Sequence, residues 1–287
     1  MGLIGNTPLT VLRAAGRTSR LIAGLGARSA GGRCLILTYH DFVDRAAADL
    51  FARQMQYLSV AASVVTLDAL LEAAHRGASH GIRCAITFDD GYEAVYREAL
   101  PHLQEHGFPA TLYLASGFIR ESLNFADCSG RSGLRPGRPM LSWRQVRELD
   151  RCGVCVGSHM SEHGDLSVLG RHEAMEQLRR SRIEIEQRLG KRCEHFAYPF
   201  GRFTAQAVQW VREAGFRTAA TTVHRPLRAN DDLLRLPRAG IQERYSLEDF
   251  KSIIRGDWDF IGLLQTLRRP ALRMTCARAT RSPYPGS

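Results

Sequence analysis

The sequence lacks the features of several common protein classes. It has no apolar run close to the roughly 18 residues that a membrane-spanning helix requires, and it shows no internal repeat. Lysine is nearly absent: Lys191 and Lys251 are the only lysines among 39 basic residues. The 37 arginines are scattered instead of forming a tract, so we predict no binding to nucleic acid. The net charge of +10 favours a polyanionic substrate or an anionic membrane surface.

The seven cysteines argue against a disulfide-stapled protein. An odd number of cysteines in a chain of 287 residues predicts reduced thiols and a cytoplasmic location. Cys152 and Cys155, in "CGVC", have the spacing of a redox motif, but no second CxxC accompanies them. We therefore interpret them as small packed side chains.

The two ends of the chain differ from the middle. Residues 1–32 form an N-terminal extension in which arginines interrupt a short apolar stretch, so we predict no signal peptide. Leu12 and Leu21, mixed with Arg13 and Arg17, would suit an amphipathic helix in peripheral contact with a membrane. Packing of this helix against the rest of the protein is the interpretation we favour. Residues 261–287 lack periodicity and are predicted to form a basic tail.

The middle of the chain alternates short apolar runs with helical patterns. A single α/β domain can reach about 250 residues, so one catalytic domain over residues 33–260 fits this length. A repeated order of strand then helix predicts a parallel sheet, either a barrel or a doubly wound sheet. The predicted strands lie in residues 34–41, 84–90, 110–117, 154–159, 195–201 and 217–223, and helices in 92–107, 142–153, 171–190 and 204–215.

Polar residues cluster where these strands end. Asp89 and Asp90 end one strand, "SHMSEHGDL" with His159 and His163 ends another, and "YPFG" with Tyr198 follows a third. Because the carboxyl ends of parallel strands share one face of an α/β fold, we expect a single site there.

The residue types at this site indicate metal chemistry. Two histidines at i and i+4 can reach one metal if the segment turns helically, and one carboxylate would leave coordination positions open. A histidine pair alone is more often structural. Two adjacent aspartates destabilise each other unless a cation or a proton separates their roles. We therefore predict that one aspartate binds a cation while its neighbour handles a proton.

With these motifs, the chain resembles the polysaccharide deacetylase family, carbohydrate esterase family 4, also called the NodB homology domain. "TFDDGY" matches the family's first motif, "SHMSEHGDLS" resembles its second, and "FAYPFG" resembles a variant of its third. The resemblance extends from about Cys34 to about Gly240. It implies a distorted (β/α)7-type barrel that hydrolyses the N-acetyl group of an amino sugar in a polysaccharide, oligosaccharide or lipid-linked glycan.

The resemblance also implies a role for each matching residue. Asp89 would be the catalytic base, and Asp90, His159 and His163 would hold a divalent metal, usually zinc in this family. The metal would polarise the amide carbonyl and a water molecule. The resemblance also implies that a backbone N–H in the "YPFG" loop, that of Phe200, would bind the oxyanion.

The sequence departs from the family pattern in two places. The arginine that usually orients the catalytic aspartate is replaced near Ala197, so another group must orient Asp89. The late histidine that serves as general acid has no matching motif, which leaves His224 as its candidate. Both departures resemble a branch with biofilm poly-N-acetylglucosamine deacetylases, which has an early "YH". This branch implies substrate-binding residues at His40, Tyr198, Pro199, Phe200 and Gly201, with Asp41 a weaker candidate.

Two other functions fit the same residues. A barrel that keeps its metal and binds a glycan without turnover would explain the missing arginine and acid, although such a binder has no need of Asp89. A metal amidohydrolase or deformylase acting on a different amide would use the same site. A panel of substrates would separate these alternatives.

Overall fold

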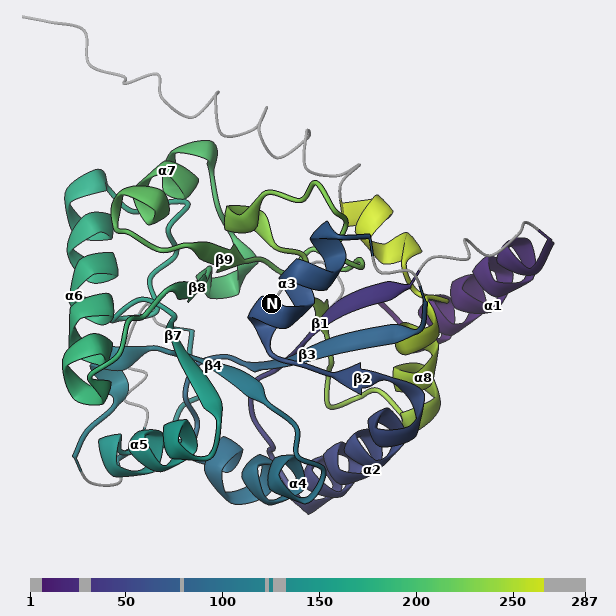
Figure 1. Cartoon of the computed structure of the whole chain (residues 1–287), viewed down its shortest axis with the longest axis horizontal. Coiled ribbons are helices and arrows are strands. Elements are labelled where there is room, and N and C mark those ends of the chain that lie inside the picture. The colour runs from purple at the N-terminus through teal and green to yellow at the C-terminus, as the bar shows by residue number, and fades with distance from the viewer. Residues whose placement is uncertain (1–6, 26–31, 78–79, 122–123, 126–132, 266–287) are drawn as a thin grey trace, which may run out of the picture.

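A curled parallel sheet forms the centre of the molecule (Figure 1). The computed structural model describes residues 7–25, 32–77, 80–121, 124–125 and 133–265. Within these residues, the main sheet has the order β10-β1-β3-β4-β7-β8-β9, and β2 pairs with β3. The strands are β1 (Arg33–Tyr39), β2 (Ser63–Val64), β3 (Ile82–Phe88), β4 (Ala110–Leu114), β7 (Val154–Ser158), β8 (His195–Ala197), β9 (Thr218–Ala220) and β10 (Ala239–Gly240), with β5 (Asn124–Phe125) and β6 (Pro139–Met140) in a separate antiparallel pair.

The sheet curls until its two edges approach each other. Ala220 in β9 forms a bridge with Leu236, and three residues later Ala239 in β10 pairs with Leu37 in β1. The predicted barrel architecture is therefore confirmed, and the connection between the last two strands, residues 221–238, contains the short helical turn Leu233–Arg235 in place of a full helix.

Helices other than α3 (Leu67–His75) cover the outside of this sheet, and α3 packs against its inner face. Most helices begin at a residue whose side chain caps them. Ser142 and Ser246 form capping boxes, and Asp44, Thr66 and Thr204 accept from the first helical turn. The helices are α1 (Leu9–Leu25), α2 (Arg45–Ala61), α3 (Leu67–His75), α4 (Leu100–Glu105), α5 (Trp143–Arg151), α6 (Arg171–Leu189), α7 (Ala205–Glu213) and α8 (Leu247–Arg255), with short helical turns at Val95–Ala99, Ser116–Phe118, Pro199–Gly201 and Leu233–Arg235.

The helix predicted over residues 92–107 is split. It begins as a π-helical segment, Val95–Ala99, and becomes α-helical at Leu100. Pro101 lies in the first turn of α4, and because proline has no backbone N–H it cannot donate to a carbonyl of the preceding π-helical segment.

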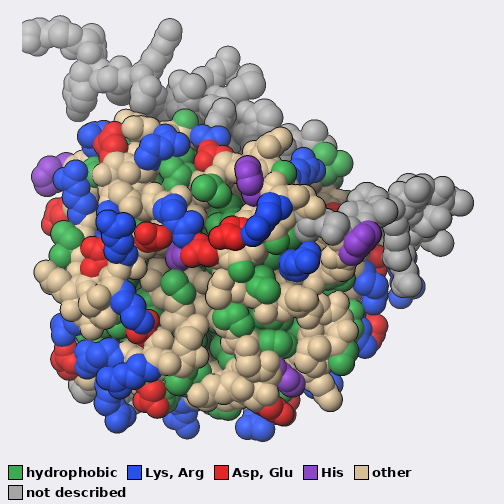
Figure 2. Space-filling model, viewed as in Figure 1, with side chains coloured by type: hydrophobic (Ala, Val, Ile, Leu, Met, Phe, Trp, Pro, Cys, Tyr) green, Lys and Arg blue, Asp and Glu red, His purple; other side chains and the backbone are tan. Residues whose placement is uncertain are grey.

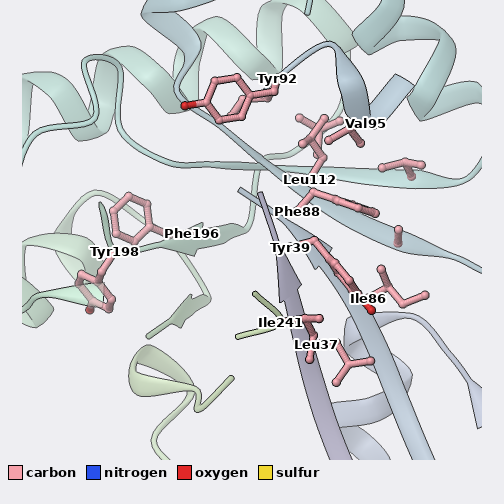
Figure 3. Close-up of a cluster of buried hydrophobic side chains, with 14 of the residues drawn as sticks. Leu37, Tyr39, Ile86, Phe88, Tyr92, Val95, Leu112, Phe196, Tyr198 and Ile241 are labelled. Atoms are coloured by element: carbon pink, nitrogen blue, oxygen red, sulfur yellow. The ribbon is translucent and has the colours of Figure 1, made fainter. Parts of the chain in front are cut away.

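The two faces of each strand have different neighbours. In β1, Leu35, Leu37 and Tyr39 join the large apolar cluster beneath the helices, part of which Figure 3 shows. Cys34 and Ile36 point to the other face and pack with α3. Side chains alternate in the same way along β3, so Asp89 continues the row of Ala85 and Thr87 on the inner face.

The N-terminal helix α1 is attached to the barrel by its first half. Leu12 is buried, and Arg13 binds Asp249 of α8 through two hydrogen bonds of 2.7 and 2.8 Å. Gly16 lies so close to Trp258 that a Cβ atom would come within 2.7 Å of the indole nitrogen. Figure 1 shows the helix continuing beyond the body of the protein. Among the described residues, no helix is both long and apolar enough to cross a bilayer.

Candidate active site and metal centre

Asp89 lies at the end of β3 in a buried ion pair with Arg238. Its two carboxylate oxygens each accept a hydrogen bond of 2.7 Å from the Arg238 guanidinium. The side chains are 2% and 1% exposed. Burial alone would raise the pKa of Asp89, but the charges of Arg238 and His159 and the Arg238 hydrogen bonds bring it below the ordinary value. Asp89 is therefore held ionised and in one orientation.

Three metal-ligand atoms converge beside this pair. Asp90 Oδ1 lies 3.3 Å from His163 Nε2 and 3.5 Å from His159 Nε2, and the two Nε2 atoms are 3.1 Å apart. A tetrahedral cation with ligand bonds of about 2.0–2.1 Å would hold its ligand atoms about 3.3 Å apart. The donor set thus fits a zinc-like cation, and the three residues are buried together.

The protonation of His159 also suits a metal ligand. Burial lowers the pKa of His159 to about 4, so its ring is neutral near pH 7. Nδ1 lies 2.8 Å from the carbonyl oxygen of Ala197, which can accept only from an N–H. The proton is therefore on Nδ1, and the lone pair of Nε2 points at the cluster.

The backbone around the site is in an uncommon conformation. Among the described residues, the non-glycine residues with positive φ are Asp90, Met160, His163 and Phe200. All four lie in the three segments that form the site. The i and i+4 spacing had suggested a helical turn between His159 and His163, but this segment is not helical. Positive φ angles at Met160 and His163 turn the chain instead. Such strain is typical of functional sites.

The structure separates the predicted residues of the "YPFG" loop. The Phe200 ring packs edge-on against the His163 ring, with centroids 4.8 Å apart, so it lines the site. Tyr198 instead points into the core, where its hydroxyl donates to the carbonyl of Leu234 and its ring contacts Phe196. The Tyr198 side chain is buried in the same apolar cluster as Phe196, two residues before it, and presents no exposed surface to a ligand.

The remaining loop residues shape the backbone. Pro199 and Gly201 are buried, and Gly201 has φ +65°. A Cβ atom at Gly201 would lie 2.0 Å from Thr222 Oγ1, so no larger residue fits. These two residues hold the Phe200 backbone in place and present little side-chain surface to a ligand.

His40 and Asp41 follow β1 but point in different directions. His40 Nε2 lies 3.8 Å from Asp89 Oδ2, and its side chain is 47% exposed, so it faces the mouth of the site. Asp41 is fully buried and bound to Arg138, so it does not reach a substrate.

His224 lies away from this cluster, and the prediction that it serves as general acid is not supported by its position. The charged groups that act on it are Asp259 and Arg33, and Arg33 begins β1 whereas the site lies beyond the other end of that strand. Seven residues of strand span about 20 Å. Burial lowers the pKa of His224 to about 4, which marks a neutral, buried side chain.

Sequence reasoning missed Arg238, which fills the role left open by the apolar residue near Ala197. Arg238 precedes β10, and β10 pairs with β1 next to β3. The one sequence feature that could have identified Arg238 is its position in "LLRLPRAG", the segment that completes the barrel. Nothing else in the sequence distinguishes it from the other arginines, of which there are 37 in all.

Comparison with known proteins gives a consistent family assignment. The family model described as polysaccharide deacetylase matches residues 76–219. The putative polysaccharide deacetylase YxkH of Bacillus subtilis is 23% identical over 137 residues, which are 48% of this chain and 43% of that protein. The poly-beta-1,6-N-acetyl-D-glucosamine N-deacetylase of Staphylococcus aureus is 23% identical over 219 residues, 73% of this chain and 70% of that protein. The chain thus spans less than half of the first relative and somewhat more than two thirds of the second.

Solved structures share the fold. Deacetylase PplD of Streptococcus pyogenes superposes with a TM-score of 0.65 at 20% identity, covering 78% of this chain and 99% of that one. IcaB of Ammonifex degensii gives 0.63 at 23% identity, covering 80% and 98%. At these sequence identities, the structural similarity establishes the barrel fold and nothing about activity.

Proposed function

Because this chain belongs to the polysaccharide deacetylase family, we propose that it hydrolyses the N-acetyl group of an N-acetylated amino sugar in a polysaccharide, oligosaccharide or lipid-linked glycan. The observation that carries the proposal is the arrangement of the two aspartates. Asp90 joins two histidines in a cation site, while Asp89 stays outside it, ionised and fixed by Arg238. A site that only bound metal would not need the second carboxylate.

Each residue of the site has a separate role in the proposed reaction. Asp90, His159 and His163 would hold a divalent cation, for which we propose zinc; when bound, it supplies Lewis acidity to the acetyl carbonyl and to water. Asp89 accepts a proton from the attacking water as the water oxygen bonds to the acetyl carbon. The Phe200 N–H donates to the carbonyl oxygen as negative charge develops there.

His40 is the proposed proton donor to the leaving group. Its imidazole is 47% exposed, and its Nε2 lies 3.8 Å from Asp89 Oδ2. When the C–N bond breaks, the nitrogen takes a proton from His40 and leaves as an amine, and acetate remains. This role falls to His40 because His224 lies near the opposite end of β1.

The test of the proposal is acetate release from a panel of N-acetylglucosamine oligomers. We expect release by zinc-loaded protein, loss of release after chelation and recovery on reloading with zinc. A parallel panel of N-formyl sugars examines the deformylase alternative. Hydrolysis of the formyl panel alone would replace the proposal by that alternative, and full metal binding without any turnover would favour the glycan-binding barrel.

We further propose that the protein binds the cytoplasmic surface of an anionic membrane. The contact is made by the end of the barrel that faces away from the site, where β1 begins. Residues 1–32 contain four arginines and residues 266–287 contain five, with no Asp or Glu in either segment, whereas residues 33–265 contain 30 basic and 29 acidic residues. Figure 2 shows basic and acidic side chains interspersed on one face of the body. The body is thus nearly neutral, and the excess charge lies at the two ends of the chain.

Gly16 of α1 lies near the end of the barrel that faces away from the site, whereas Gln265, the last described residue before the C-terminal segment, donates to the carbonyl of Thr222 beside Gly201 of the "YPFG" loop. Arg33, which begins β1, binds Asp259 with hydrogen bonds of 2.8 and 3.0 Å, and Trp258 contacts Gly16 of α1. Each basic residue near an anionic surface contributes about 1 kcal/mol of attraction. Docking by this end would leave the site open to a glycan.

Vesicle sedimentation tests the membrane contact. We expect the protein to bind phosphatidylglycerol vesicles at low salt, to bind phosphatidylcholine vesicles at least tenfold more weakly, and to lose binding when residues 266–287 are removed and Arg17 and Arg20 are changed to glutamate. The control reverses two exposed arginines of the body, Arg179 and Arg180. Equal binding to both lipids, or unchanged binding by the first variant, would contradict the proposal.

A further inference from the structure

Residues 133–141, which we call the strap, lie against the loop that follows Asp89 and Asp90. Leu141 N donates to Gly91 O at 2.9 Å, and Glu93 N donates to Pro139 O at 2.9 Å. Arg135 N donates to the Tyr92 hydroxyl at 2.7 Å. Three hydrogen bonds therefore join the strap to residues 91–93, immediately after Asp89 and Asp90.

The strap is also bound to the end of β1 through an ion pair whose carboxylate is buried and whose arginine is partly exposed. Arg138 donates from Nε to Asp41 Oδ2 at 2.7 Å and from Nη2 to Asp41 Oδ1 at 2.9 Å. The Asp41 side chain is 0% exposed. Arg138 Nη2 also donates to the carbonyl of Phe42 at 2.8 Å, and the Phe42 N–H donates to Asp41. These contacts fix the backbone directly after His40.

A third contact joins the strap to the "YPFG" loop. Gly133 has φ +63°, and a Cβ atom there would lie 2.5 Å from the Phe200 ring. The same ring packs on His163 from the other side. The strap therefore limits where the Phe200 ring can lie.

We propose that the strap positions His40 and Phe200 for the reaction, and that Asp41 and Arg138 are the positioning residues that hold it. This inference rests on the proposed function. The strap contacts the ends of β1, β3 and β8, three strands that each deliver a different group to the site. Asp41 acts through its neighbour His40 and through the strap, without touching substrate.

The energetics favour this role over simple loop packing. A bidentate arginine–carboxylate pair fixes orientation as well as distance. Asp41 is fully buried and also lies 3.8 Å from Nη1 of Arg135, so its charge is stabilised by two arginines of the strap. Opening the strap would leave this buried carboxylate without a cation, which is strongly destabilising. Since His40 and Phe200 act on groups that change charge only during the reaction, misplacing them lowers kcat more than it changes KM.

The first test measures the anchor without any substrate. Hydrogen exchange of peptides covering residues 133–142 is compared in wild type, Asp41→Asn and Arg138→Lys, with peptides of α6 as internal reference. We expect at least tenfold faster exchange in the strap of both variants and unchanged exchange in α6. The matched control is Glu248→Gln, which removes a surface pair with Lys251 within α8. Unchanged exchange in the strap of both variants would overturn the proposal, whatever the activity of the protein.

The second test measures positioning. We expect Arg138→Lys to lower kcat about 100-fold with KM within threefold and metal content unchanged, because a misplacement near 1 Å can have that effect. Gly133→Ala should act in the same direction through Phe200, whereas Gly107→Ala should not, since Gly107 has a similar φ of +62° with no atom within 4 Å of its Cβ position. A loosened strap with wild-type kcat would refute the positioning role. Absence of acetate release by wild type would refute the proposed function, and the exchange test would still decide the anchor.

Discussion

Replacing Asp89 with asparagine is expected to lower kcat for acetate release by about 10³-fold or more while the protein keeps its metal. A general base contributes about 10²- to 10⁴-fold, and asparagine has no carboxylate to accept the proton. Asp89 Oδ2 lies 4.0 Å from His159 Nε2, outside the set of three ligand atoms, so the cation site stays complete. His163→Ala should by contrast lose metal and turnover together.

The same substitution removes the charge partner of Arg238, so folding must be measured beside activity. Asp249→Asn is the matched control, because Asp249 is also buried and accepts two hydrogen bonds from one arginine, Arg13. We expect both variants to unfold at lower denaturant concentration and only Asp89→Asn to lose turnover. More than a tenth of wild-type turnover in metal-loaded Asp89→Asn would show that another group is the base.

The position of Asp89 was predictable because it follows from alternation along a strand. Ala85, Thr87 and Asp89 are spaced by two, so a buried strand turns all three toward the same face. Parallel strands then bring their carboxyl ends to one edge of the barrel, which places "SHMSEHGDL" and "YPFG" near the two aspartates. Local pattern and a general rule of α/β folds were sufficient for these residues.

The missed features depend on contacts between residues far apart in the chain. Asp89 and Arg238 are separated by 149 positions, and no local pattern connects them. The Tyr198 hydroxyl donates to the carbonyl of Leu234, 36 positions away, which holds this side chain in the core. Positive φ at Met160 could not be expected from propensity, since methionine rarely adopts it; tertiary contacts impose it.

Replacing Arg238 with methionine should reduce both stability and turnover. Methionine fills a similar volume but leaves the Asp89 carboxylate buried without a partner, and breaking a buried pair in this way costs about 3–5 kcal/mol of unfolding free energy. The loss of the positive charge raises the pKa of Asp89 and frees its rotation, because Arg238 supplies both the charge and two hydrogen bonds. We expect kcat to fall at least 100-fold.

Lysine at the same position separates the two contributions of Arg238. Arg238→Lys restores the positive charge but not the two parallel hydrogen bonds that fix the carboxylate plane, so stability should recover more than turnover. Arg225→Met is the control, since Arg225 makes a similar bidentate pair with Asp231 at 2.7 and 2.8 Å in the loop between β9 and β10. Wild-type kcat in Arg238→Met would mean that Asp89 needs no arginine to orient it. Full recovery of kcat by lysine would instead mean that charge alone, without the bidentate geometry, prepares Asp89 for proton transfer.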